Sequence, residues 1–159
     1  DAAVATLIAV DIDAPRLELA RELGASHTID GREGDVVARI QGIEPGGVMY
    51  SMEASAALPA LNDAIACLMR RGECALLTVP KLGAPVPLTL APLLTGGRRL
   101  IAVLEGDRVP GAFIPPLAPL HLAGRLPIDR LVVDYGFDDI AAALDDASAG
   151  RAIKPVLRF

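Results

Sequence analysis

The segment LIAVDIDAPRLELARELGASHTID, residues 7–30, contains two strand patterns separated by one helix pattern. Leu7–Asp11 is an apolar run that ends on a carboxylate. Asp13 is a suitable helix N-cap, and Gly24 is a good helix stop. Ala25–Ile29 then has the composition of a short strand. A strand, a helix and a second strand in this order predict a parallel pair of strands with a crossover helix.

The same alternation continues to the end of the chain. The further strands are expected at Val48–Glu53, Cys74–Val79, Leu100–Leu104, Leu131–Tyr135 and Lys154–Phe159. Helices are expected at Asp35–Gln41, Leu58–Met69, Ala91–Leu94, Phe137–Ala149 and, broken by prolines, Val109–Leu122. The strands are nearly continuous apolar runs, which is typical of strands covered by helices on both faces. The fold class is therefore α/β, with a doubly wound parallel sheet.

Composition and charge exclude several classes of protein. Hydrophobic residues make up 52% of the 159 residues, which argues against disorder. The apolar runs are too short for a membrane span, and a net charge of −5 argues against a nucleic-acid partner. Cys67 and Cys74 are expected to be reduced core residues, which favours a cytoplasmic protein. The two cysteines and two distant histidines make no zinc pattern, so no metal site is expected within the chain.

Asp11 is the residue with the clearest chemical meaning. In dinucleotide-binding folds, an acid at the end of the second strand accepts hydrogen bonds from the adenosine ribose hydroxyls. Its charge also repels the 2′-phosphate of NADP and so favours NAD. An acid at this position has two further possible roles. The carboxylate could merely cap the next helix, or it could bind the ribose of S-adenosylmethionine in a methyltransferase-like domain.

Segments along most of the chain resemble the cofactor domain of zinc-type medium-chain alcohol dehydrogenases. Residues 7–30 are similar to the second strand and following helix of that family. The other similar segments are VMYSMEAS at 48–55, CALLTVP at 74–80, GGRRLIAVLEGD at 96–107, FIP at 113–115 and DYGFDDIAAALDDASAGRAIKPVLRF at 134–159. The EGD and FIP segments most resemble the aryl-alcohol (benzyl-alcohol) branch. The resemblance implies a partial dinucleotide-binding domain plus the C-terminal segment over residues 1–159, without the GroES-like catalytic domain.

The resemblance also implies roles for individual residues around NAD. Asp11 would bind the ribose hydroxyls and Arg16 would lie beside the adenosine, while Lys154 would approach the pyrophosphate. Ala54 and Ser55 would line the cofactor cleft, and on the nicotinamide side the implied residues are Leu77, Thr78, Val79, Val103 and Glu105. Leu77 would act through its carbonyl, and Val103 and Glu105 through backbone groups that face the carboxamide.

Several of these residues also have plain structural interpretations. Arg16 is placed to pair with Asp13 at helical spacing, and Lys154 fits a surface lysine. Glu53 fits a structural acid or a cap of the next helix. Ala56 stands where the family usually has glycine, so a methyl group would crowd the backbone near the cofactor.

Two parts of the family pattern do not occur in the sequence. There is no GxGxxG, the turn that supplies backbone N–H groups to the pyrophosphate, and the family's zinc ligands and proton relay precede the matched segments. In the strand order 3-2-1-4-5-6, strand 1 is central, so its absence would leave a gap of about 9–10 Å between its neighbours. The remaining strands could close this gap, with Ala2–Val10 lengthening an edge. Alternatively, the real molecule has a strand there that precedes Asp1.

The expected function is therefore the cofactor-binding portion of an NAD-dependent, zinc-dependent dehydrogenase. It would interconvert a primary aromatic alcohol and its aldehyde, with zinc held outside this chain and no catalytic residue within it. The chain alone is expected to be inactive. A homodimer or tetramer through Leu100–Leu104 is also expected. Two alternatives are a non-catalytic nucleotide-binding or dimerisation module and a methyltransferase-like domain, whose final strands would be antiparallel.

Overall fold

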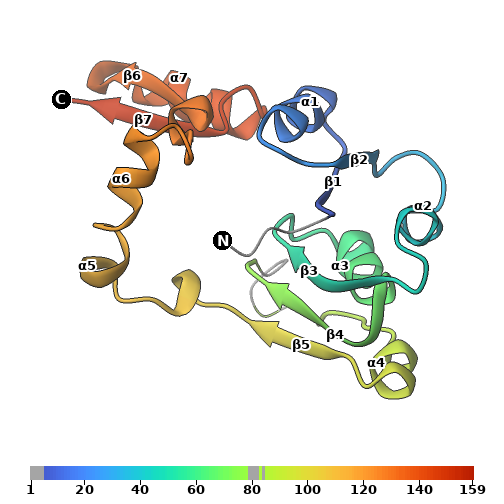
Figure 1. Ribbon diagram of the computed structural model, residues 1–159. Helices are drawn as coiled ribbons and strands as arrows, with labels where there is room; N and C mark the ends of the chain where they lie inside the picture. The colour runs from blue at the N-terminus through green and yellow to red at the C-terminus, as the bar shows by residue number, and fades with distance from the viewer. Residues whose placement is uncertain (1–5, 79–82, 84) are drawn as a thin grey trace. The chain divides into compact units, whose positions relative to one another are not determined.

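The computed structural model describes residues 6–78, 83 and 85–159, and strands alternate with helices along them (Figure 1). The strands are β1 Ile8–Asp11, β2 His27–Asp30, β3 Val48–Glu53, β4 Leu68–Leu76, β5 Arg99–Ala102, β6 Val132–Gly136 and β7 Lys154–Arg158. The α-helices are α1 Ala14–Glu22, α2 Val36–Ile43, α3 Leu58–Ala66, α4 Leu90–Gly96, α5 Pro110–Phe113, α6 Leu117–Leu122 and α7 Ile140–Ser148. The 3₁₀ turns are η1 Glu105–Asp107, η2 Ile128–Leu131 and η3 Phe137–Asp139.

All the strand pairs of the described residues are parallel, which confirms the α/β class. They form the sheets β1-β2, β3-β4-β5 and β6-β7. The parallel pairing of β6 with β7 contradicts a methyltransferase-like ending, which needs an antiparallel final strand. The chain divides into two compact units, Asp1–Asp107 and Arg108–Phe159.

In the first unit, β1 and β3 each lie at the edge of a different sheet. Among the described residues β1 pairs with β2 alone, and β3 pairs with β4 alone. The two sheets have therefore not closed onto each other, and Ala2–Ala5 lie outside the described residues. A shared apolar cluster instead connects the two sheets, with Ile29, Val36, Ile40 and Cys67 buried and Ile8 and Val48 packed against them.

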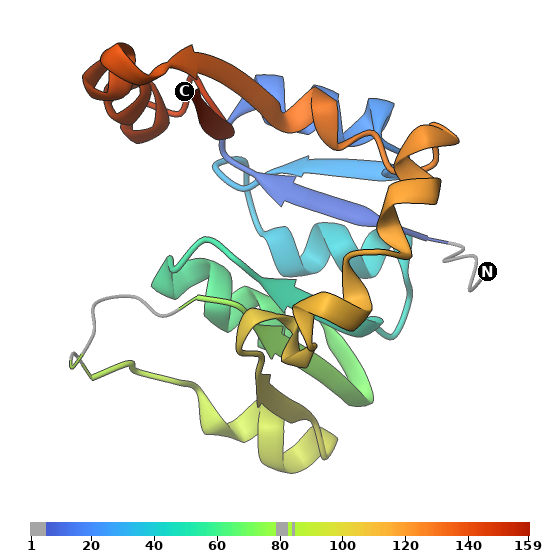
Figure 2. The same ribbon diagram turned by 90° about the vertical axis from the view of Figure 1, so that its left-hand side faces the viewer.

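A second apolar cluster lies beneath the three-stranded sheet. Leu61 and Ile65 of α3 pack there against Leu68 and Cys74 of β4. In Figure 2, β3, β4 and β5 lie side by side, and the helices α3 and α4 lie next to them. The two apolar clusters thus hold the strands in place. The loop segments described below follow directly from the carboxyl ends of these strands.

Local sequence signals set several helix boundaries as expected. Asp13 accepts a hydrogen bond from the Arg16 backbone nitrogen at 2.9 Å and caps α1. Asp35, expected as the first residue of its helix, instead precedes α2 and caps it by accepting from the Ala38 nitrogen at 3.0 Å. The proline-rich segment Val109–Leu122 forms two short helices, α5 and α6, as the prolines predict.

The expected helix Leu58–Met69 is wrong at its end. The helix stops at Ala66, and Leu68 begins β4, where it is fully buried and pairs with Val48. Leu68 has the spacing of an apolar helix face, yet it fills the core as a strand residue. The register between β3 and β4 then shifts, and Arg71 adopts a left-handed conformation with φ of 64°.

The observed boundaries of other strands differ by a few residues from the expected ones, because strand ends depend on pairing between distant segments. The observed β2 begins at His27 and not at Ala25, and β4 ends at Leu76 and not at Val79. The observed β5 is Arg99–Ala102, where Leu100–Leu104 was expected. Val79 itself lies outside the described residues.

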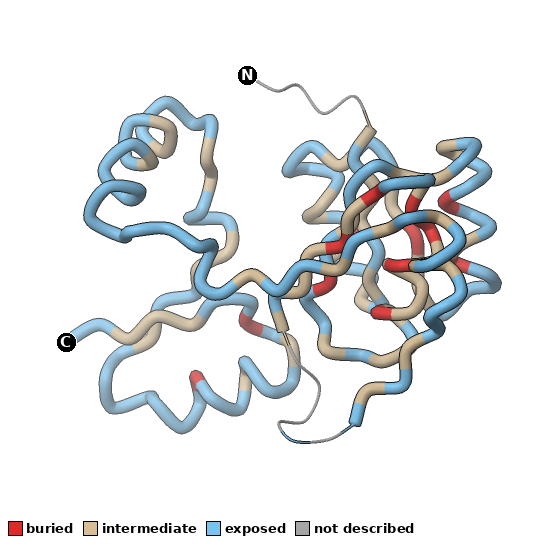
Figure 3. The backbone as a smooth tube through the Cα atoms, turned by 90° about the horizontal axis from the view of Figure 1, so that it is seen from below, coloured by how far each residue is buried: buried red, intermediate tan, exposed pale blue. Residues whose placement is uncertain are grey.

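Buried residues are concentrated in the first unit (Figure 3). In the second unit, the described buried residues are the small side chains Ala143 and Ala152. The second unit is instead rich in polar links, such as the pair between Arg158 of β7 and Asp134 of β6. Within the described residues, no helix is long and apolar enough to cross a membrane.

Candidate functional site

The carboxyl ends of β3, β4 and β5 lie next to one another, as parallel pairing requires. The Leu77 nitrogen donates to the Glu53 carbonyl at 3.0 Å, and the Val103 nitrogen donates to the Leu76 carbonyl at 2.9 Å. These bonds continue the sheet by one residue beyond each strand. In open α/β sheets, ligands bind outside this edge.

Glu53 ends β3 with a buried carboxylate at this edge, and the residue is only 4% exposed. Its Oε1 accepts from the Ser55 nitrogen at 2.7 Å and from Ser55 Oγ at 2.5 Å. Its Oε2 accepts from Thr78 Oγ1 at 3.1 Å and from the Ala56 nitrogen at 3.4 Å. A buried carboxylate needs such donors to offset its lost hydration. Glu53 therefore connects the segments that follow β3 and β4.

The chain turns sharply just after this carboxylate. Ala56 has φ of 61°, the left-handed conformation that favours glycine. The Ala57 nitrogen donates to Ser55 Oγ at 3.1 Å, and α3 starts immediately afterwards at Leu58. The family resemblance implies glycine at position 56, and the left-handed backbone gives the physical reason for that preference.

Asp11 ends β1 with a carboxylate held by the following turn. Its Oδ1 accepts from the Ile12 nitrogen at 2.7 Å and from the Asp13 nitrogen at 3.0 Å. Within the described part of the chain Oδ2 accepts no hydrogen bond, so this oxygen is available to a ligand there. Arg16 lies in the first turn of α1, and its Nε is buried without a hydrogen-bond partner among the described residues.

Asp30 ends the neighbouring strand β2 directly beside Asp11 in the register. Its carboxylate accepts from Arg32 Nε at 3.0 Å and from Arg32 Nη2 at 2.6 Å. These hydrogen bonds, with one from the Arg32 backbone nitrogen, lower the pKa of Asp30 to about 2. This pair was not predicted, although an acid that ends a strand and an arginine two residues later are visible in the sequence.

The structure brings together only part of the predicted set. Ser55 and Thr78 meet through Glu53, and Leu77 and Val103 lie at the same edge. The Val103 N–H is used by the sheet, so only its carbonyl can serve a ligand. Ala54 is exposed beside Ser55.

Two predicted residues lie in less regular surroundings. Glu105 opens η1, where Glu105, Gly106 and Asp107 all have positive φ. Lys154 is the exposed first residue of β7, in the second unit. The approach of Lys154 to the pyrophosphate stays a prediction.

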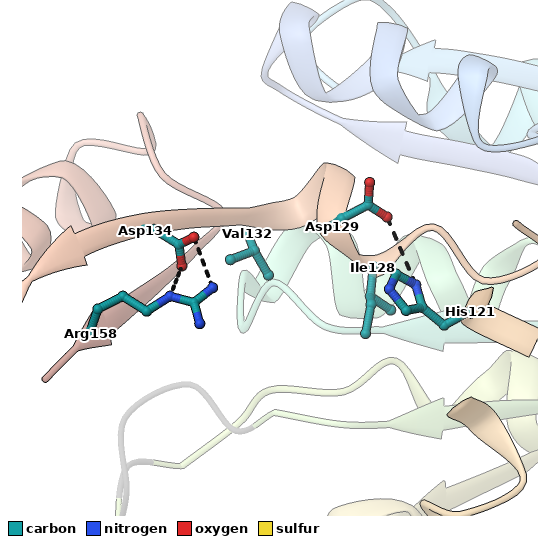
Figure 4. A pocket seen from close by; sticks show the side chains of 6 residues that line it. All are labelled: His121, Ile128, Asp129, Val132, Asp134 and Arg158. Atoms are coloured by element: carbon teal, nitrogen blue, oxygen red, sulfur yellow. Dashed lines mark hydrogen bonds and ion pairs between the residues drawn. The ribbon is translucent and has the colours of Figure 1, made fainter. Parts of the chain in front are cut away.

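The second unit has a separate open hollow of about 270 Å³ (Figure 4). It is lined by His121, Ile128, Asp129, Val132, Asp134 and Arg158. Arg158 and Asp134 form a two-pronged pair, with distances of 3.0 and 2.9 Å, and His121 Nδ1 lies 2.9 Å from the Leu126 carbonyl oxygen. None of the predicted cofactor residues lines this hollow.

Zinc does not fit the described residues. No group of three or more histidine, cysteine, aspartate or glutamate side chains in the described ranges is arranged to hold a metal ion. Cys67 and Cys74 are both free and buried. Burial raises the pKa of the Cys67 thiol to about 11, with a further contribution from Cys74, which disfavours the thiolate that binds zinc.

Comparison with known proteins gives strong matches. A family model described as zinc-binding dehydrogenase matches residues 1–118. Geraniol dehydrogenase of Castellaniella defragrans is 42% identical over 154 residues, which cover 96% of this chain and 41% of that protein.

Two solved structures are also very similar to this chain. An alcohol dehydrogenase zinc-binding domain protein from Burkholderia ambifaria has a TM-score of 0.93 at 44% identity, over 98% of this chain and 42% of that one. Benzyl alcohol dehydrogenase from Acinetobacter calcoaceticus has a TM-score of 0.93 at 37% identity, over 98% and 43%. The chain thus spans about two fifths of the length of these relatives.

Proposed function

The chain belongs to the zinc-binding dehydrogenase family, and we propose on this basis that it is the cofactor-binding portion of an NAD-dependent alcohol dehydrogenase. Residues 1–159 would supply part of a dinucleotide-binding domain and the C-terminal segment. The family supports the dehydrogenase class. The choice of NAD rests on one observation, the carboxylate of Asp11 at the end of β1 with Oδ2 unused by the described residues.

The preference for NAD over NADP follows from charge and hydrogen-bonding capacity. The free oxygen of Asp11 accepts from ribose hydroxyls, while its negative charge repels a 2′-phosphate. Asp13 lies next to it and adds to the negative potential, although its Oδ1 caps α1. Arg16 lies beside the adenosine in this proposal, and Lys154 approaches the pyrophosphate.

The edge formed by Ser55, Leu77 and Thr78 would hold the nicotinamide half. NAD supplies a hydride acceptor when it is bound. The role of this chain would be to orient the nicotinamide ring and exclude water on one side. Zinc ligands and a proton relay would come from outside the chain, so the 159-residue polypeptide alone would oxidise no alcohol.

An aromatic primary alcohol is the proposed substrate class. The support is similarity to benzyl alcohol dehydrogenase over 98% of this chain, together with the EGD and FIP segments. The Castellaniella relative is a geraniol dehydrogenase, and geraniol is also a primary alcohol, with a double bond beside the carbinol carbon. The free, buried cysteines support action in a reducing compartment, and we propose the cytoplasm.

The test compares NAD and NADP binding to the purified chain by ligand-observed NMR, which detects millimolar affinities. We expect NAD to bind more tightly than NADP, and Asp11→Asn to reduce or reverse this preference. Asp138→Asn is the matched control, because it removes the same charge from an exposed residue of the second unit. Equal binding of NAD and NADP by the unmodified chain would contradict the assignment.

Substrate class requires a hybrid enzyme. The matching segment of the Castellaniella geraniol dehydrogenase would be replaced by residues 1–159. We expect NAD-dependent oxidation of benzyl alcohol by the hybrid and none by the chain alone. Normal oxidation by the isolated chain would disprove the proposed absence of catalytic groups.

A dimerisation module is the second candidate function. It is favoured by β5, which is an edge strand of the three-stranded sheet and leaves Ile101 38% exposed. Pairing of residues 100–104 with a second copy would cover this edge. Sedimentation of the wild-type chain and of Ile101→Lys tests it, and a dimer that does not bind NAD would favour this function over the first.

A further inference from the structure

The Glu53 carboxylate is the acceptor in each of its hydrogen bonds with the described residues. Ser55 donates from its nitrogen and its hydroxyl, Ala56 donates from its nitrogen, and Thr78 donates from its hydroxyl. A carboxylate that only accepts needs no proton of its own, which is the ionised form. The charge on Glu53 therefore fixes the direction in which the two neighbouring hydroxyl groups point their hydrogen atoms.

Of the two hydroxyl groups that donate to Glu53, that of Thr78 has unused lone pairs among the described residues. A hydroxyl has one hydrogen atom to donate and two lone pairs that accept. The hydrogen of Thr78 is committed to Glu53, and no donor among the described residues reaches Thr78 Oγ1. Ser55 differs, because its oxygen already accepts from the Ala57 nitrogen at 3.1 Å. Thr78 is half-buried at the sheet edge.

We infer that Glu53 orients the Thr78 hydroxyl so that Thr78 presents only hydrogen-bond acceptors to the cofactor cleft and binds a donor group of the nicotinamide half. This inference rests on the proposed function. The donor is either the carboxamide N–H₂ or a hydroxyl of the nicotinamide ribose. Thr78 would contact the cofactor directly, and Glu53 is a positioning residue that acts through it.

The negative charge of the Glu53 carboxylate also makes the Thr78 hydroxyl a better hydrogen-bond acceptor. A hydroxyl that donates to an anion is polarised, and linked hydrogen bonds strengthen one another in a low dielectric. A ligand group that can only accept, such as a phosphate oxygen, would meet lone pairs and gain no hydrogen bond. The site thus selects the donor-rich nicotinamide end over the phosphate end of the cofactor.

The test measures NAD affinity of the 159-residue chain by ligand-observed NMR in four single variants and one double variant, with melting temperature in parallel. Thr78→Val keeps the shape of the side chain and removes the acceptor, and we expect NAD affinity to fall about three- to tenfold. Thr78→Ser should restore most of the affinity. Thr95→Val is the matched control, because the hydroxyl of Thr95 donates only to the Ala91 carbonyl on α4. It should leave NAD affinity unchanged.

Glu53→Gln tests the positioning role. The new amide donates to Thr78 Oγ1, so the threonine hydrogen turns outward and an acceptor is lost. We expect a loss of affinity similar to that of Thr78→Val, and little further loss when the two changes are combined. A purely structural Glu53 would lower the melting temperature without this non-additive effect on NAD affinity.

The cofactor analogue 3-acetylpyridine adenine dinucleotide identifies the donor, because it lacks the carboxamide N–H₂. If Thr78→Val no longer weakens binding of this analogue, the carboxamide is the partner of Thr78. If the weakening persists, the partner is a ribose hydroxyl.

Two outcomes would overturn the inference. Wild-type affinity in Thr78→Val would overturn the inference alone and leave the proposed function in place. Absence of NAD binding by the wild-type chain would overturn both. Thr78 is only half-buried, so we expect Thr78→Val to fold. The comparison of its NAD affinity with that of the wild-type chain therefore remains decisive even if Glu53→Gln fails to fold.

Discussion

Tyr135 of β6 donates its hydroxyl hydrogen to Asp146 Oδ2 of α7, with the two oxygens 2.7 Å apart. Arg151 Nε donates to the other oxygen of the same carboxylate at 2.7 Å. The hydrogen bond from Tyr135 and those from Arg151 lower the pKa of Asp146, and the bond to Asp146 raises the pKa of Tyr135. One carboxylate therefore fixes α7 to the strand before it and to the turn after it.

Tyr135→Phe should destabilise the second unit at pH 8, because it removes this donor. The pKa of Tyr135 is raised above its usual 10.0 in the folded state. Its contribution to stability is therefore complete below pH 10 and disappears as the pH rises through the higher folded value. Urea unfolding at about pH 8 and about pH 11 measures the difference between wild type and variant. Tyr50→Phe, at a residue 72% exposed, is the control, and a difference that persists unchanged at the higher pH would contradict this prediction.

Arg32→Ala should raise the pKa of Asp30 from about 2 toward its ordinary value of 3.8. The folded pKa is depressed, so the stabilisation is present above about pH 4 and is lost as the pH falls toward 2. A ¹³C NMR titration of the aspartate carboxyl groups measures the change. Arg21→Ala, which removes the surface pair with Glu18, should leave the Asp30 titration where it is.

Both cysteines should resist thiol reagents in the folded chain at pH 8. Burial raises the pKa of Cys67 to about 11 and also raises that of Cys74, so neither is a thiolate at that pH. Reaction with a chromogenic disulfide should release colour only after denaturant is added. The raised folded pKa of Cys67 also means that its contribution to stability is complete below pH 9 and lost toward pH 11. Rapid labelling of the native protein would show that the cysteines are accessible.

Gly47→Ala should be among the most destabilising single changes in the chain. Gly47 has φ of 93°, and an added Cβ would overlap the carbonyl oxygen of Cys67 and the backbone of Leu68 and Met69. The combined strain and overlap should cost about 2–4 kcal/mol. Urea unfolding measures the loss, with Gly42→Ala as the control, because a Cβ at Gly42 meets no atom within 4 Å. A variant as stable as Gly42→Ala would refute the close approach at this turn.

Ala56→Gly should stabilise the turn after β3 by roughly 1 kcal/mol. Alanine pays a steric cost of about 1–2 kcal/mol in the left-handed region, and glycine recovers most of it despite its greater freedom in the unfolded chain. Thermal unfolding of the two proteins provides the comparison. A lower melting temperature for the glycine variant would indicate that the Ala56 methyl group makes a contact that outweighs its strain.

Signals carried by neighbouring residues were predictable from the sequence. Asp13 caps the helix that follows it, and prolines divide α5 from α6. Each of these features depends on residues within one or two turns of the chain. The alternation of strands and helices, which determines the α/β class, was visible for the same reason.

Features that depend on distant partners were not predictable. Leu68 has the spacing of a helix face, and only its pairing with Val48 identifies it as a strand residue. Glu53 collects donors from Ser55 and from Thr78, which is 25 positions away. A lone acid at the end of a strand pattern does not reveal which hydroxyl will reach it.

The parallel pairing has a consequence for how the chain folds. Pairing brings Ile8 to His27, Ser51 to Cys74, Cys74 to Leu100 and Val132 to Lys154, which are separations of 19, 23, 26 and 22 positions. Each strand–helix–strand unit is therefore complete within a short length of chain, and the entropy of closing its loop rises only slowly with length. Each of these pairs can therefore form without the strands that follow it along the described chain.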